Sequence, residues 1–264
     1  MIIIDVAVSS ARRAAYDVLV GVERGAFSSD LLAAENMDRD SRDAGLAEEI
    51  ALGVLRWRSA IDFIIEKLAG RPVQKLDFEV LTALRMGVYQ IRWLDRIPGY
   101  AAIHESVELI KSARKRSAAG FANAVLRKVT RDPVDWPDDA RRLSCPQWLL
   151  DRWTARYGAE AAQGIAAAAL QRPERFVRIG PKDEVPAGME ATEVPGAFIA
   201  PAGIGGRVQD ISSQTIIPLL ELQPGQKFLD VCSAPGNKTA QALETDVEVI
   251  AADLSATRDR KSVV

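Results

Sequence analysis

The sequence predicts an α + α/β chain, in which an all-α helical bundle is followed by a small α+β connecting module and the start of a doubly wound α/β domain. Three observations predict this order. Apolar residues recur at helical spacing from residue 9 to about residue 132. Glycine and proline are frequent between residues 181 and 206, as is typical of loops and edge strands. From Lys227, a strand-like run, a loop, a helical segment and a second strand-like run form a β-α-β pattern, which builds parallel sheets.

The bundle is expected to occupy residues 9–132 and to contain six or seven helices. Ser10 is the expected N-cap of the first helix, which Gly25 ends. Asp77 is the expected N-cap of the helix that begins at Phe78. Each helical segment carries apolar residues three or four positions apart, which places them on one face. Five of these helices have expected bounds: 11–24, 46–68, 78–94, 101–115 and 118–128.

Residues 133–206 are expected to form a linker and the connecting module, and residues 207–258 the first part of the α/β domain. The linker is indicated by the prolines and aspartates of 132–139, which favour neither a helix nor a packed strand. The elements expected in the module are helices at 148–157 and 159–171 and a strand at 176–179. Those expected in the last domain are a helix at 213–222, a strand at 227–231, a helix at 238–244 and a strand at 247–252.

The composition of the 264 residues, 48% apolar and 27% charged, is that of a soluble globular chain with one large domain or two ordinary ones. A net charge of −2 gives no overall field toward nucleic acid or membrane, so such binding would need a local patch. Two cysteines and one histidine predict neither a disulfide framework nor a zinc site. No signal core or long apolar run is present, so we expect a cytoplasmic chain that binds no membrane. We also expect a monomer without a bound metal.

Positive charge is concentrated at one end of the predicted bundle. Residues 85–131 contain ten Lys or Arg and three Asp or Glu, whereas residues 1–84 contain ten basic and fourteen acidic residues. Such a run is usually a solvated face. The functional interpretation is a phosphate-binding surface, on which each Lys or Arg that neutralises a phosphate releases a counterion.

The segment from Phe228 to Gln241 indicates a ligand-binding loop. It is expected to form a strand end, a tight turn through Pro235 and Gly236, and a helix start whose backbone N–H groups face a crevice. Asp230 would accept a hydrogen bond or balance a positive ligand, and Asp253 would hold two ribose hydroxyls. A phosphate-binding P-loop would need glycines where Cys232 and Asn237 stand, and a dinucleotide fingerprint also fails. An ordinary strand–turn–helix without a ligand is the alternative.

Asp230-Val-Cys-Ser-Ala-Pro-Gly-Asn-Lys-Thr239 resembles the S-adenosylmethionine (SAM) loop of RNA cytosine methyltransferases that make 5-methylcytosine. The usual form of that loop is Asp-x-Cys-x-Ala-Pro-Gly-Gly-Lys-Thr, and Val208-Gln-Asp-Ile-Ser-Ser-Gln214 is similar to the segment that precedes it. Ala11–Leu19, Asn123–Arg127 and the basic cluster resemble a NusB-like RNA-binding domain. This domain order is similar to that of the RsmB (Sun/Fmu) family, which methylates a cytosine of 16S ribosomal RNA. The resemblance extends from residue 9 to about residue 258.

The resemblance implies a Rossmann-like SAM-dependent methyltransferase domain and an rRNA partner. The residues that it assigns to SAM are Cys232, Ser233, Ala234, Pro235, Gly236, Asn237, Lys238 and Asp253. The residues that it assigns to RNA are Arg114, Lys115, Arg116, Arg127 and Lys128. Asn237 replaces a second glycine, and we expect it to adopt the left-handed backbone that Asn tolerates better than most residues.

In the family, two cysteines downstream of the SAM loop carry the catalysis, one as a nucleophile on carbon 6 and one assisting release. No cysteine follows Cys232 here, so we expect no catalytic residue in this chain. Cys232 and Cys145 are interpreted as buried, inert residues, and His104 as a capping or packing residue. The chain is therefore expected to be an amino-terminal fragment that does not catalyse methyl transfer. Residues 259–264 resemble a translated sequencing adapter and are expected to be a non-native tail.

Two alternatives are open at this point. One is a NusB-type RNA-binding or antitermination factor without catalysis, which the SAM-like loop disfavours. The other is an unrelated small-molecule methyltransferase, which the Cys-Ser-Ala-Pro-Gly loop and the basic bundle disfavour.

Overall fold

A computed structural model describes residues 8–36, 40–201 and 203–254. The expected tail at 259–264 lies outside these residues. The chain divides between Gln171 and Arg172 into two compact units. This division falls inside the segment 133–206 that we predict as one connecting module, so the helices of that segment belong to the first unit and its strands to the second.

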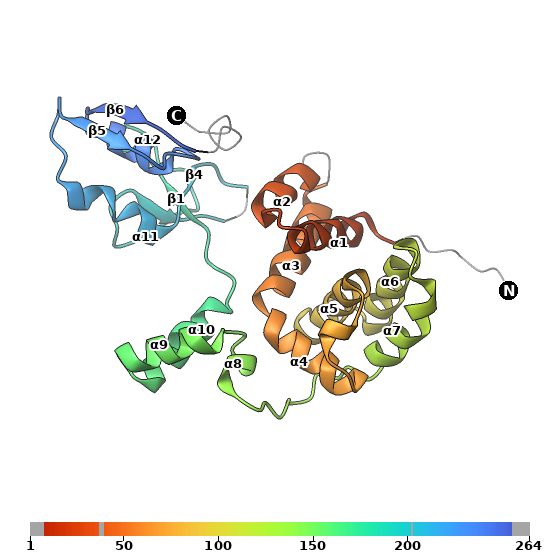
Figure 1. Cartoon of the computed structure of the whole chain (residues 1–264). Helices are drawn as coiled ribbons and strands as arrows, with labels where there is room; N and C mark the ends of the chain where they lie inside the picture. The colour runs from red at the N-terminus through yellow and green to blue at the C-terminus, as the bar shows by residue number, and fades with distance from the viewer. Residues whose placement is uncertain (1–7, 37–39, 202, 255–264) are drawn as a thin grey trace. The chain divides into compact units, whose positions relative to one another are not determined.

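The first unit is helical (Figure 1). Its α-helices are α1 (Ser10–Glu23), α2 (Ser28–Asn36), α3 (Ser41–Arg56), α4 (Arg58–Ala69), α5 (Phe78–Trp93), α6 (Gly99–Ser112), α7 (Ala119–Leu126), α8 (Asp139–Arg142), α9 (Gln147–Tyr157) and α10 (Ala159–Ala169). Two 3₁₀ turns, η1 (Val73–Lys75) and η2 (Arg116–Ala118), connect α4 to α5 and α6 to α7.

Helix α5 is the centre of the bundle. Every residue from Val80 to Ile91 is buried, because α1, α3, α4, α6 and α7 all contact this helix. Gly53 of α3 permits one of these close approaches, since a Cβ there would lie 2.0 Å from the Tyr89 ring. A helix that is buried all round needs apolar residues on every face, and α5 has them.

The buried side of α1 is held by a polar network as well as by apolar packing. The Arg12 guanidinium donates to Glu105 at 2.8 Å and to Gln90 at 2.6 Å, and the Ser9 hydroxyl donates to Glu105 at 2.7 Å. Arg12 and Glu105 are both buried, so this pair connects α1 to α6 inside the unit. Removing either partner would leave a buried charge without compensation, which is strongly destabilising.

The structure corrects several predicted helix boundaries in the bundle. Ser9, not Ser10, is the N-cap of α1, and the Ser10 hydroxyl instead donates to Asp43. The predicted helix 46–68 is two helices that meet at Trp57, whose ring lies 4.8 Å from that of Trp93. Both halves bury their apolar faces in the same core, so periodicity alone does not reveal the break.

Helix α2 was not predicted, and two caps differ in detail. Of its described side chains only that of Leu32 is buried, so the segment lacks the apolar stripe on which a helix prediction depends. Asp77 is the N-cap residue of α5, as expected, but its side chain makes no capping hydrogen bond and pairs with Lys115 at 2.9 Å instead.

The second unit contains two small sheets. The strands are β1 (Phe176–Arg178), β2 (Glu190–Ala191), β3 (Ala197–Ile199), β4 (Arg207–Val208), β5 (Lys227–Asp230) and β6 (Glu248–Ala251). The first four form an antiparallel sheet in the order β2-β3-β1-β4, and β5 pairs with β6 in parallel. Helix α12 (Asn237–Leu243) connects the parallel strands and packs on them through Ala242 (Figure 1). The predicted β-α-β order of these three elements is therefore observed.

The predicted helix 213–222 is wrong as a single element. The segment folds as α11 (Ile211–Gln214) and a 3₁₀ turn η3 (Ile217–Leu220). Asp210 caps α11 by accepting from the Ser212 and Ser213 backbone N–H groups. A hydrogen bond from the Ser212 hydroxyl, together with these backbone bonds, lowers the pKa of the Asp210 carboxyl. Pro218 has no N–H to continue the helix, which explains why α-helical bonding stops before it.

Candidate functional site

The loop between β5 and α12 is held at its start by Asp230. One carboxylate oxygen of Asp230 accepts from the Cys232 backbone N–H at 3.1 Å, and the other accepts from the Thr239 hydroxyl at 2.7 Å. Thr239 is only 1% exposed, so its hydroxyl has little access to water as an alternative partner. Asp230 thereby connects the start of the loop, at Cys232, to Thr239 in the first turn of α12.

The carboxyl end of β6 holds the middle of the same loop. Asp253 accepts from the Ala234 backbone N–H at 3.1 Å, and the Ser233 N–H donates to the Ala252 carbonyl at 3.0 Å. In the parallel pair Asp230 lies opposite Ala251, so Asp230 and Asp253 both lie at the carboxyl ends of neighbouring strands. The loop is therefore bracketed by two carboxylates, which is where parallel α/β sheets bind ligands.

The turn into α12 depends on Gly236. This residue has φ 98° and ψ 0°, a left-handed conformation that a side chain would strain, and its N–H donates to the Ser233 carbonyl. Asn237 is the first residue of α12, with a helical backbone, so the expectation that it adopts a left-handed conformation is wrong. Its side-chain amide instead donates to the Val208 carbonyl of β4 at 3.0 Å.

The other predicted cofactor residues differ in exposure. Ser233 and Gly236 are buried, Ala234, Asn237 and Asp253 are half-buried, and Cys232, Pro235 and Lys238 are exposed. The interpretation of Cys232 as a buried residue is therefore wrong, because the chain around it forms an open turn. Cys145 is buried as expected, and burial raises the pKa of its thiol.

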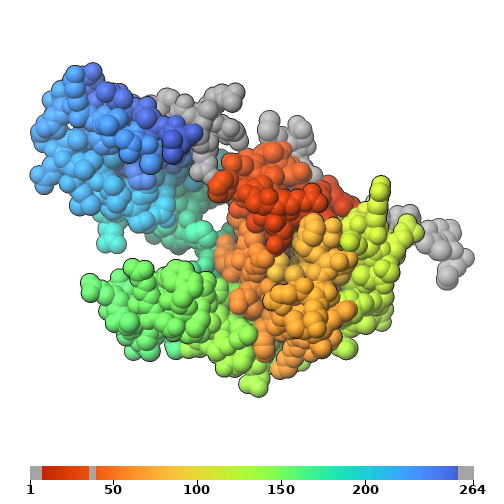
Figure 2. All heavy atoms as spheres, viewed as in Figure 1, coloured from red at the N-terminus to blue at the C-terminus, as the bar shows by residue number. Residues whose placement is uncertain are grey.

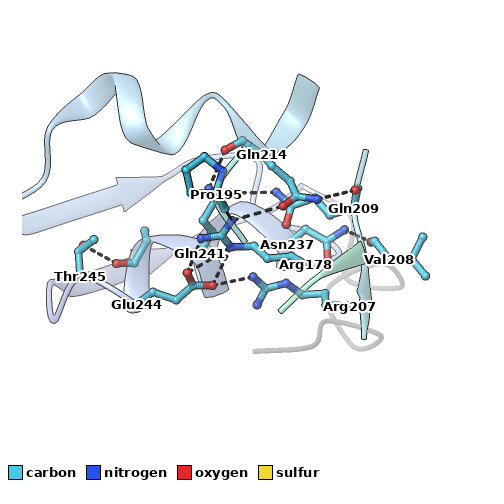
Figure 3. Close-up of polar contacts among 11 residues, drawn as sticks. Arg178, Pro195, Arg207, Val208, Gln209, Gln214, Asn237, Gln241, Glu244 and Thr245 are labelled. Carbon is cyan, nitrogen blue, oxygen red and sulfur yellow. Dashed lines mark hydrogen bonds and ion pairs between the residues drawn. The ribbon is translucent and has the colours of Figure 1, made fainter. Parts of the chain in front are cut away.

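Three buried glutamines connect this loop region to the antiparallel sheet (Figure 3). The Gln209 amide donates to the Gln241 side chain at 3.0 Å, Gln241 donates to the Gln214 carbonyl at 2.7 Å, and Gln214 donates to the Gln209 carbonyl at 2.9 Å. All three are at most 2% exposed. They lock α11, α12 and the end of β4 together.

An ion-pair cluster beside the glutamines has the same effect. Glu244, one residue beyond α12, accepts from the Arg178 Nε at 2.8 Å and pairs with Arg207 at 3.1 Å, and all three side chains are mostly buried (Figure 3). Sequence reasoning missed both clusters. The only available signal was the presence of Gln209 and Gln214 in the segment 208–214, since the partners are 32 and 27 positions away.

In the basic region of the bundle, several cations have structural partners. Arg85 forms paired bonds to Asp62 at 2.7 and 2.8 Å and also reaches Glu23. Arg131 donates to the carbonyls of Ile91 and Leu94. Lys111 pairs with the carboxylate of Glu108. Arg92 donates to the backbone carbonyls of Thr130 and Asp132. Burial lowers the pKa of the Arg92 guanidinium.

The five predicted RNA-binding cations divide into two groups at the two ends of α7. Arg114 and Arg116 are exposed before the helix, and Arg127 and Lys128 are exposed after it, with about 12 Å of helix between them. Lys115 is half-buried and pairs with Asp77 at 2.9 Å, and this hydrogen bond raises the pKa of the Lys115 ammonium. Lys115 is therefore already neutralised within the fold.

Two further predictions concern His104 and metal binding. His104 is exposed within α6, so it neither caps nor packs as expected. In the part of the chain that the structure describes, no group of three or more His, Cys, Asp or Glu side chains could hold a metal ion. Within the same residues, no helix combines the length and apolar character that crossing a membrane requires.

Comparisons with known proteins agree with this organisation. The NusB family model matches residues 9–131. The chain is 32% identical to ribosomal RNA small subunit methyltransferase B of Pseudomonas putida, over 94% of the chain and 64% of that protein. It is 30% identical to the probable ribosomal RNA small subunit methyltransferase B of Bacillus subtilis, over 89% of the chain and 60% of that protein. The chain is thus similar to ribosomal RNA small subunit methyltransferases B over most of its length.

The chain spans about three fifths of the length of the curated relatives it matches. The crystal structure of PH0851 has a similar fold, with a TM-score of 0.71, 18% identity, and coverage of 96% of this chain and 65% of that one. This similarity concerns the fold alone.

Proposed function

We propose that the protein takes part in SAM-dependent methylation of carbon 5 of a cytosine in 16S ribosomal RNA. Residues 9–132 would bind RNA, and residues 207–258 would be the first part of a Rossmann-like SAM-binding domain. The observation that carries the proposal is the loop Asp230–Thr239, bracketed by Asp230 and Asp253 at the carboxyl ends of two parallel strands. The similarity to ribosomal RNA small subunit methyltransferase B over 94% of the chain supports it.

The residues around the loop fit SAM chemically. A carboxylate has about four acceptor positions, so the bond from Ala234 does not exhaust the capacity of Asp253 to accept from ribose hydroxyls. Val231 and Leu254, next to the two carboxylates, are exposed apolar residues against which an adenine ring would pack. SAM supplies an activated methyl group when bound. Residues Cys232–Lys238 would shape its binding surface.

The chain's own part in the reaction is to bind and orient. Asp230 already holds the loop through Cys232 and Thr239, so we assign it the role of a positioning residue. The exposed cations at both ends of α7 would bind RNA phosphates, with Lys115 contributing least because Asp77 neutralises it. No cysteine follows Cys232, so we expect this chain to bind without methylating. A cytoplasmic location, a monomeric state and independence of metals stay predictions.

Filter binding and methyl transfer test this proposal together. The chain is expected to retain 16S ribosomal RNA in a salt-dependent manner, to retain radiolabelled SAM without RNA, and to transfer no label to the RNA. A NusB-type antitermination factor, the alternative, would retain RNA and not SAM. Incorporation of label above background would refute the expectation that this chain lacks its catalytic residues.

A further inference from the structure

Helix α9 carries exposed aromatic and arginine side chains that neither the core nor the SAM-like loop uses. Trp148 and Tyr157 are 65% and 59% exposed, and Arg152 and Arg156 are exposed as well. Trp148, Arg152 and Arg156 are spaced four residues apart, so they follow one another along the same side of the helix. The α9–α10 segment, coloured green, presents an open surface in Figure 2.

The core-facing side of α9 is already complete. Leu150 is 6% exposed and packs with Ala162 and Ala166 of α10, and Leu149 and Trp153 pack partly against the same cluster. Trp148 has no share in this cluster. Its ring is therefore accessible, and it lies on the same side of the helix as Arg152 and Arg156.

A hollow lies beside the exposed residues. It has a volume of about 480 Å³ and is lined by Arg152, Trp153, Ala155, Arg156 and Tyr157. This volume is within the ordinary range of ligand pockets. Two guanidinium groups and two aromatic rings line it, so its chemistry suits a flat ring that carries a negative charge nearby.

The two arginines of α9 have no counter-ion among the residues that the structure describes. Neither Arg152 nor Arg156 makes an ion pair with another described residue, whereas the two arginines of α8 pair with Asp138 and Asp139. The acid of α9, Asp151, accepts a hydrogen bond from Gln147 on the flank of the helix. The exposed face therefore combines unneutralised positive charge with aromatic rings.

We propose that the exposed surface of α9 binds a single-stranded segment of RNA, with one base stacked on Trp148, phosphates held by Arg152 and Arg156, and another base stacked on Tyr157 in the hollow that both arginines line. Single strands are recognised in this way because every base has a π-face and every linkage a phosphate. The apolar surface is interrupted by arginines, which favours RNA over a hydrophobic protein partner. The inference rests on the proposed function in that the chain acts on RNA, and it adds a second RNA-binding surface outside the NusB-family domain.

Fluorescence anisotropy with a short labelled single-stranded RNA tests this inference. Trp148→Ala is expected to weaken binding at least about fivefold, because base–aromatic stacking contributes on the order of 1 kcal/mol or more. Trp148→Phe keeps a ring and is expected to bind nearly as the wild type does. The matched control is Tyr100→Ala, which removes an aromatic ring that is 78% exposed on α6.

Charge is tested in the same assay. The double variant Arg152→Gln/Arg156→Gln is expected to reduce the slope of log affinity against log salt by about 1.4, at about 0.7 for each RNA phosphate that is no longer neutralised. Lys67→Gln/Lys75→Gln removes two exposed cations elsewhere in the unit and serves as its control.

Affinities of the α9 variants equal to those of the wild type would overturn the inference while leaving the proposed function intact, since SAM retention is measured without RNA. A change in sedimentation of Trp148→Ala with unchanged RNA affinity would also overturn it, in favour of a second copy of the chain as the occupant. If the chain does not retain SAM but its RNA binding depends on the α9 residues, the proposed methylation is refuted and the α9 binding site is supported.

Discussion

Replacing Glu244 by Gln tests whether the second unit is held together by its buried ion pairs. Glu244 pairs with both Arg178 and Arg207, and its side chain is 15% exposed. The variant keeps the shape and removes the charge, so two partly buried guanidinium groups lose their counter-ion. Each charge-assisted bond contributes about 1.5–3 kcal/mol, and partial solvent screening brings the expected total to about 3 kcal/mol.

Native-state hydrogen exchange of residues 227–251 is the suitable assay. All five tryptophans lie in the first unit, so tryptophan fluorescence does not report on the second. About 3 kcal/mol corresponds to roughly a 150-fold increase in the opening constant of β5, α12 and β6. Glu248→Gln is the matched control, because its pairing with Lys227 spans 3.7 Å between side chains that are 63% and 77% exposed. Equal exchange in the two variants would refute the reasoning.

Three further predictions follow from the described interactions. Burial, reinforced by nearby acids, raises the pKa of Tyr16 from 10.0 to about 12. The first unit is therefore expected to lose stability as the pH rises from about 10 to 12, and the Tyr16→Phe variant is expected to lose less. Urea unfolding followed by tryptophan fluorescence measures both. Arg116→Gln is expected to weaken retention of 16S ribosomal RNA more than Lys115→Gln does, because Lys115 is paired within the fold. Thr239→Val removes the hydroxyl bond to Asp230 and is expected to weaken SAM binding at least about tenfold in calorimetry, because a bond to a charged group contributes about 1.5–3 kcal/mol.

Each of these predictions can be contradicted by a specific result. The sign of the pH effect follows from the neutral phenol being favoured in the folded state, so an equal loss of stability in wild type and Tyr16→Phe would contradict it. A larger RNA effect for Lys115 than for Arg116 would contradict the assignment of free and paired cations. Thr245→Val, which removes a hydroxyl bond to a backbone carbonyl outside the loop, is the control for Thr239.

Local patterns in the sequence were sufficient for much of the fold. Helix α5 and the order β5, α12, β6 follow from periodicity and from the turn residues Pro235 and Gly236, which act over a few positions. The break at Trp57 could not be predicted, because both flanking helices continue the same apolar spacing into one core. Helix α2 was missed because it buries too little apolar surface to leave a pattern.

The residues assigned to the candidate site stay predictions, and the hydrogen bonds that hold the loop could not be derived from the sequence. The sequence placed Asp230 and Asp253 at strand ends, but the bonds to Thr239 and Ala234 required the folded loop. The same limitation applies to the positive residues, since Lys115 is neutralised by Asp77, 38 positions earlier in the chain. Pairing between distant residues leaves no periodic signal, so only the structure separates cations that are free from those that hold the fold together.

Calorimetric titration of the chain with SAM tests the central claim most directly. The account predicts saturable binding at one site, weakened at least about tenfold by Asp253→Asn, since a neutral amide accepts ribose hydroxyls less strongly than a carboxylate does. Asp246→Asn changes an exposed residue of the same unit and is expected to bind as the wild type does. Absence of SAM binding, or equal affinity in Asp253→Asn and wild type, would contradict the claim that this loop holds the methyl donor.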